Sequence, residues 1–116
     1  MDFFLRKPRL PVIIDIGTEL LVVKIWATCE KRLAKAIFAD NESRDVIDST
    51  AEGFSYYPEM KYFSPLTLKK HWTKAGIIKL YNDRRGPDLA EYQPKSLGNK
   101  SLERVVKDVV ELLSTT

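Results

Sequence analysis

Two short apolar runs near the N-terminus constrain the fold more than any other feature of the chain. Residues 11–16 (PVIIDI) and 19–28 (ELLVVKIWAT) are rich in β-branched side chains, and Gly17 and Thr18 separate them. This pattern predicts two strands joined by a tight turn in which Gly17 takes a positive φ. Nearly every position is apolar, so we expect a sheet buried on much of both faces, with these two as central strands.

The next segments are less clear. As a helix, residues 30–38 (EKRLAKAIF) would place Leu33, Ala34, Ile37 and Phe38 on one face; as a strand, their side chains would alternate. The segment lacks an evident N-cap and would complete a meander, so we predict a strand. Residues 39–45 read as a polar turn, and residues 46–63 as two or three short strands divided by turn residues.

Residues 64–85 have helical signals. Ser64 followed by Pro65 is typical of an N-cap with proline in the first turn, and Thr73 offers a second N-cap. Gly86 and Pro87 would end the segment. Two helices, or one helix kinked at Gly76, are both compatible with this pattern.

A polar loop over residues 86–100 precedes the clearest helical pattern, which Asn99 or Ser101 can cap. Apolar residues recur there at helical spacing: Leu102, Val105, Val106, Val109, Val110 and Leu113. Oppositely charged residues lie four apart on the other face. We therefore expect one α+β domain over residues 1–116: an antiparallel sheet of about four to six strands, two or three helices on one face, and an amphipathic C-terminal helix.

Composition restricts the chemistry. Cys29 is the single cysteine and His71 the single histidine among 116 residues. The chain therefore has no internal disulfide and lacks a zinc signature, and we expect no metal and no cofactor. The apolar runs are too short for a signal peptide or a membrane span, so we expect a cytoplasmic protein that does not bind membranes.

Charge is segregated along the chain, although its formal net charge is only +3. Residues 40–60 contain six acidic residues and one basic, whereas residues 61–85 contain seven basic and one acidic. Three interpretations remain open: pairing within the chain, self-association through faces of opposite charge, and docking of an anionic partner.

Two groups of side chains are candidate binding residues. The basic group, with an indole that can stack on a base, is a candidate for nucleic-acid contact: Lys69, Lys70, His71, Trp72, Lys74, Arg84 and Arg85. If residues 64–72 and 74–85 are two helices, they resemble a helix-turn-helix. An aromatic group either lines a pocket for a small apolar or aromatic ligand or belongs to the core: Phe54, Tyr56, Tyr57, Tyr62, Phe63, Trp72 and Tyr81.

Residues 12–18 (VIIDIGT) resemble the first phosphate-binding hairpin of the actin and sugar-kinase superfamily and the first strand of RNase H-like folds. The resemblance covers about fifteen residues. It implies a metal-binding role for Asp15 and a phosphate loop at Gly17 and Thr18. The chain is too short for the two-domain kinase fold, and later carboxylates at matching places are not evident.

Catalytic constellations are sparse. A Cys29–His71 pair needs the fold to bring the two side chains together, and Asp45 with Asp48 can equally belong to an acidic turn. We therefore expect a small non-enzymatic binding or interaction domain that self-associates as a homodimer. The alternatives are a nucleic-acid-binding accessory protein that uses residues 61–85, and a small metal-dependent or hydrolytic enzyme.

Overall fold

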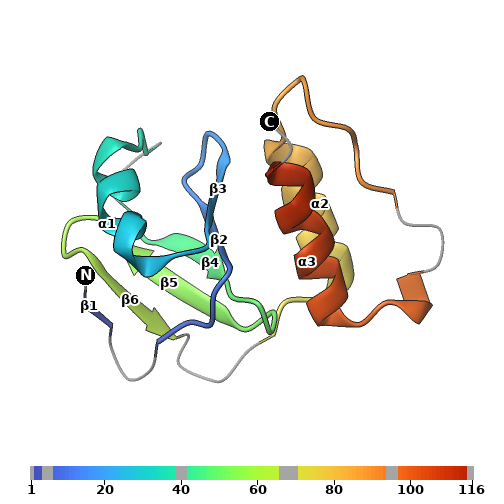
Figure 1. The fold of residues 1–116 in the computed structure, drawn as a ribbon, viewed down its shortest axis with the longest axis horizontal. Helices are drawn as coiled ribbons and strands as arrows, with labels where there is room; N and C mark the ends of the chain where they lie inside the picture. The colour runs from blue at the N-terminus through green and yellow to red at the C-terminus, as the bar shows by residue number, and fades with distance from the viewer. Residues whose placement is uncertain (1, 4–6, 39–41, 66–70, 94–96, 115–116) are drawn as a thin grey trace.

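The computed structural model describes residues 2–3, 7–38, 42–65, 71–93 and 97–114. Six strands form one sheet in the order β1-β6-β5-β4-β2-β3, flanked by three α-helices (Figure 1). Strands β2 to β6 pair antiparallel, and the two-residue β1 (Asp2–Phe3) joins β6 as a parallel strand. The predicted α+β class and the predicted number of strands are confirmed.

The first hairpin forms where the sequence predicts it. Strand β2 (Val12–Asp15) pairs with β3 (Leu20–Val23), and Asp15 lies opposite Leu20 at the turn. Gly17 has a φ of 90°, a backbone conformation that residues with a Cβ rarely adopt. The second strand is shorter than predicted, since residues 19–28 also contain the start of the first helix.

Both faces of the hairpin are buried, as predicted. Ile13 belongs to a core formed with α2 (Lys74–Arg84) and α3 (Leu102–Leu113), whereas Val12 and Ile14 belong to a second core under α1 (Trp26–Lys35). Figure 1 shows α1 on one side of the hairpin and the α2–α3 pair on the other. The prediction that all helices pack on one face is therefore wrong, because consecutive residues of β2 point to opposite faces and each face is apolar.

Three more strands form within the region that the sequence assigns to two or three. They are β4 (Arg44–Ile47), β5 (Gly53–Tyr57) and β6 (Tyr62–Pro65). Val46, Phe54 and Phe63 bring these strands into the core under α1. The β5–β6 turn contains Lys61 with a φ of 55°, so a residue other than glycine occupies the left-handed region there.

Helix α1 corrects the strand predicted for residues 30–38. It begins at Trp26 and ends at Lys35, and Ile25 at its N-cap makes no side-chain capping bond. Cys29 and Leu33 are four residues apart, share one face, and are buried against the sheet. Packing therefore determines this helix in the absence of local capping signals.

Helix α2 begins later than the first of the two predicted N-caps. Ser64 and Pro65 end strand β6, where they pair with Ser55 and Phe54, so the helix predicted from Ser64 is wrong at that end. Thr73 is the true N-cap, and its hydroxyl accepts a hydrogen bond from the Gly76 N–H at 3.0 Å. The helix ends at Arg84, just before Gly86 and Pro87, as predicted.

Helix α3 begins after Ser101, whose hydroxyl accepts from the Arg104 N–H. Its four valines are buried, and Glu103, Lys107 and Glu111 are exposed. The preceding loop is anchored to both helices: the Asn82 side chain exchanges two hydrogen bonds with the Tyr92 main chain, and the Tyr92 hydroxyl donates to Asp108 at 2.6 Å. No helix in the described part of the chain is long and apolar enough to cross a membrane.

Asp108 provides a test of this anchor. Burial alone would raise the pKa of Asp108, but hydrogen bonds from Lys100 and Tyr92, with the charges of Lys100 and Arg104, outweigh burial and lower it. A lowered pKa stabilises the fold at pH values above the carboxyl pKa of the unfolded protein, which is about 4. This stabilisation is lost as the pH falls through the pKa of the folded protein. We expect Asp108→Asn to lower the free energy of unfolding by about 1–2 kcal/mol at neutral pH. Urea denaturation between neutral pH and about pH 3 measures this difference, which should shrink with acidification.

Asp83→Asn is the matched control. Asp83 pairs with Lys79 on an exposed face of α2, so its loss should change the free energy of unfolding by less than about 0.5 kcal/mol. Equal effects of the two substitutions, or a difference that is constant with pH, would contradict the role assigned to Asp108.

Candidate functional site

Strand β3 lies at the edge of the sheet, which corrects the prediction that both strands of the first hairpin are central. Its sequence is apolar at every position, as in an interior strand, and its two faces are covered by α3 and by the core under α1. Sheet edges are usually protected by charges, proline or short length. Strand β3 itself contains four apolar residues, and the first charged side chain after them is Lys24.

The turn geometry shows which main-chain groups of β3 point outward. Ile16 donates its N–H to the Glu19 carbonyl at 3.2 Å, so these two residues form a hydrogen-bonded pair. Bonded and non-bonded pairs alternate along an antiparallel ladder. The pairs Asp15–Leu20 and Ile13–Val22 are therefore non-bonded, and the N–H and C=O groups of Leu20 and Val22 point away from β2.

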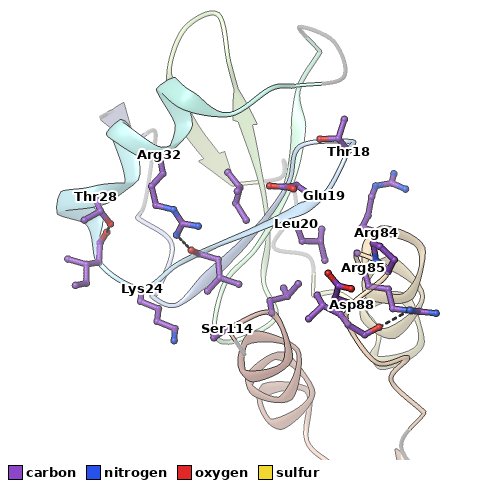
Figure 2. Close-up of a pocket in the computed structure, with 17 residues that line it drawn as sticks. Thr18, Glu19, Leu20, Lys24, Thr28, Arg32, Arg84, Arg85, Asp88 and Ser114 are labelled. Atoms are coloured by element: carbon purple, nitrogen blue, oxygen red, sulfur yellow. Dashed lines mark hydrogen bonds between the residues drawn. The ribbon is translucent and has the colours of Figure 1, made fainter. Parts of the chain in front are cut away.

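One hydrogen bond along this edge supports that assignment. The Arg32 guanidinium of α1 donates to the Val22 carbonyl (Figure 2). Within the described residues, the N–H groups of Leu20 and Val22 have no hydrogen-bond partner. The edge thus presents main-chain donors and acceptors at the spacing of a ladder.

A groove of about 780 Å³ runs along the open edge. Figure 2 shows Thr28 and Arg32 on one side of β3, with Arg84, Arg85 and Asp88 on the opposite side. Ile25, whose side chain is 60% exposed, adds an apolar contact on the α1 side, and Leu89 and Leu113 add two on the other. The groove therefore combines an open strand edge with mixed apolar and charged walls.

Basic side chains outnumber acidic ones among the described residues that line the groove. The lining contains four basic residues, Lys24, Arg32, Arg84 and Arg85, and two acidic ones, Glu19 and Asp88. Arg84 is paired with Asp15 at 3.1 Å, and Arg85 donates to the Leu89 carbonyl at 2.8 Å. The sequence identifies Arg84, the last residue of α2, and Arg85, its C-cap, as binding candidates, and both line the groove.

Asp15 has a structural role at this place. Its carboxylate accepts the Gly17 N–H at 2.8 Å and pairs with the Arg84 guanidinium. Both contacts are to Oδ1, so the main chain of the turn and the Arg84 guanidinium account for the position of this carboxylate. Among the described residues, no group of three side chains is placed to bind a metal ion. The metal and phosphate roles that the family resemblance implies therefore have no support from the geometry.

The other predicted basic residues do not join the groove. Lys69 and Lys70 lie outside the described residues, and His71 is exposed beside Glu52, with which it forms an isolated bridge. Trp72 packs against the α2–α3 core, and its main-chain N–H donates to the Ala51 carbonyl. Lys74 begins α2. Ser64 and Pro65 are in β6, so the first helix predicted for residues 64–72 does not begin at Ser64, and residues 66–70 of that segment lie outside the described residues.

The predicted aromatic group is divided between the core and the surface. Phe54, Tyr56 and Phe63 belong to the core under α1, and Tyr81 belongs to the other core. Tyr57 and Tyr62 are half-buried and stack with ring centroids 4.9 Å apart across β5 and β6. No aromatic side chain is among the described residues that line the groove.

The acidic segment also contains structural carboxylates. Asp48 is buried and accepts the N–H groups of Arg9, Thr50 and Glu52, which closes the turn between β4 and β5 around Ala51, whose φ is 69°. Asp45 is exposed on the neighbouring strand. Asp48 thus acts as a turn cap, and its hydrogen bonds oppose the metal role considered for it with Asp45.

Cys29 lies in the core under α1, whereas His71 is exposed near the β4–β5 turn. Burial raises the pKa of the Cys29 thiol to about 11, against the smaller opposing effect of Arg32. The fold therefore does not bring the two side chains together as the nucleophilic pair would require.

The sequence did not identify Lys24, Ile25 or Arg32 as binding candidates. Lys24 alone interrupts the apolar run after β3, and Ile25 and Trp26 continue it, so the local pattern does not separate these residues from the strand. The proximity of α1 to the end of α2 depends on the strand order, which no local pattern shows. Comparisons of the chain with known protein families, curated proteins and solved structures gave no match.

The environment of Cys29 predicts slow alkylation. At about pH 8, iodoacetamide should modify the native thiol at least a hundredfold more slowly than the urea-unfolded thiol, because the side chain is buried and its thiolate is scarce. Mass spectrometry of quenched samples measures both rates. The variant Cys29→Ala with Thr28→Cys moves the thiol to the exposed neighbouring position and should react rapidly in the native state. Similar native rates for the two proteins would contradict the placement of Cys29.

Proposed function

We propose that this protein is a non-enzymatic binding domain that captures an extended peptide segment as an additional strand along β3. The observation that carries the proposal is the mismatch between the sequence and the position of β3. The strand is apolar on both faces like an interior strand, yet no strand of the described residues pairs with one of its two edges. An added strand would give β3 the two neighbours that its composition suits.

The groove fits a peptide main chain. Leu20 and Val22 offer outward N–H and C=O groups, and an antiparallel or parallel segment can bond both. Side chains of an added strand would alternate between the α1 wall, with Ile25 and Arg32, and the opposite wall, with Leu89 and Arg85. Main-chain bonds would supply affinity and the two walls would supply selectivity.

Nucleic acid is a weaker candidate for this groove. Single strands bind through stacking on aromatic side chains as well as through cations, and the described lining supplies cations without an aromatic side chain. Self-association through two β3 edges is also weaker, since it would bring the four basic side chains of each copy close to those of the other. We therefore retain the expected class, a binding domain, and propose an extended peptide as its ligand in place of a second copy of the chain.

The test begins with selection from a displayed library of peptides of about ten residues, long enough for one strand. Binding of a selected peptide should slow amide hydrogen exchange at Leu20 and Val22, measured by NMR. Leu21 and Val23 are built-in controls, because their N–H groups already face β2. Their exchange should change much less.

Backbone N-methylation of the peptide gives the sharper measurement. Two peptides are compared, each methylated on one of the two sets of alternate residues; one set of N–H groups faces β3 and the other faces outward. Methylation of the set that faces β3 should weaken binding by more than about tenfold, and methylation of the other set should weaken it little. Equal effects of the two registers, or a library that yields no peptide that protects Leu20 and Val22, would overturn the proposal.

A further inference from the structure

The charges of the groove indicate which extended segment it takes. Of its four basic side chains, only Arg84 has a carboxylate partner among the described residues, at Asp15. Lys24, Arg32 and Arg85 form no ion pair within that part of the chain. The groove thus holds three positive charges that no carboxylate of the described chain neutralises by contact.

Arg32 is placed to exchange one partner for another. Its guanidinium now donates to the outward carbonyl of Val22, the acceptor that an added strand needs. When a ligand N–H takes that carbonyl, the guanidinium is released at the wall of the groove. A ligand side chain that points to the α1 wall lies next to it, and a carboxylate is the acceptor that a guanidinium binds best.

The opposite wall also carries a guanidinium, that of Arg85, together with the carboxylate of Asp88. Arg85 uses one nitrogen for the Leu89 carbonyl, and a guanidinium carries further donors. Side chains of an added strand that alternate with those facing Arg32 point toward this wall. Carboxylates on either face of the ligand would therefore meet a cation, while lysine or arginine would meet unneutralised positive charge.

We infer that the occupant of the β3 groove is an acidic extended segment whose aspartate or glutamate side chains pair with Arg32 on one wall and Arg85 on the other. This inference rests on the proposed strand addition and specifies its ligand class. Ile25 and Leu113, on opposite walls, offer contacts to apolar side chains that stand between the acidic ones of the ligand.

The experiment compares charge at constant shape. The first probe is a peptide of about ten residues in which glutamate alternates with valine or threonine; the second replaces every glutamate by glutamine, and the third by lysine. Fluorescence anisotropy should give binding to the first that is at least tenfold tighter than to the second, with no measurable binding to the third. Affinity for the first should fall as salt rises from about 0.05 to 0.5 M.

Matched variants locate the charge. Arg32→Gln should weaken binding of the glutamate peptide by about two- to fivefold and reduce the preference over the glutamine peptide. Lys31→Gln removes the same charge from the adjacent, exposed position of α1 outside the groove and should leave the preference unchanged. Circular dichroism of both variants checks that the fold is retained.

The outcomes separate this inference from the proposed function. Equal affinity for the glutamate and glutamine peptides, or equal effects of the two substitutions, would overturn the acidic preference while register-dependent N-methylation would still support strand addition. Loss of that register dependence would overturn both. Acid-dependent binding that leaves Leu20 and Val22 unprotected would place the carboxylates elsewhere and reject this site. A dimer that forms through protected Leu20 and Val22 amides and excludes the peptides would identify a second copy as the occupant.

Discussion

The alternation of side chains along β2 is the constraint on which the rest of the structure depends. Ile13 enters the core beneath α2 and α3, while Val12 and Ile14 enter the core beneath α1. A slip of one residue would exchange the two sets and fill neither core. The register is held at the turn, where Gly17 supplies the positive φ and Asp15 accepts its N–H. Arg84 pairs with the same carboxylate and so connects the turn to the end of α2.

This arrangement also creates the groove. Because helices cover both faces of β3, they lie on each side of its outer edge, and the edge forms the floor of a groove between them. The end of α2 and α1 then supply walls, and their basic side chains lie near main-chain groups that lack a neighbouring strand. The same two cores that stabilise the hairpin therefore define a site whose floor is backbone and whose walls are charged.

Local patterns predicted the elements that local interactions determine. Thr73 and Ser101 cap helices where their side chains predict it, and the repeat of valines identifies α3. Ser64 and Pro65 gave a false helix start because proline also fits the end of a strand, where its missing donor does no harm. Helix α1 was missed because it lacks a side-chain cap and its buried face is only Cys29 and Leu33.

The candidate site was harder to predict than the fold. The run of basic residues over 61–85 identifies Arg84 and Arg85. Lys24, Ile25 and Arg32 become candidates only when β3 is known to be an edge strand. Strand order is a property of long-range pairing: β2 lies between β3, its neighbour in the chain, and β4, which follows a helix. A single sequence shows that a strand is apolar and does not show how many neighbours it has.

The opposite end of the sheet differs from the β3 end in a way that limits growth. There β1 covers β6 with only two residues, Asp2 and Phe3, and the Phe3 ring stacks on Phe63 and meets Trp26 of α1 edge-on. An edge so short gives an incoming strand little to pair with. Polymerisation through sheets needs two complementary ends on each subunit. If β3 takes up a strand as proposed, the two described residues of β1 would offer a second strand few main-chain groups, so addition would end with one segment and would not extend into a fibril.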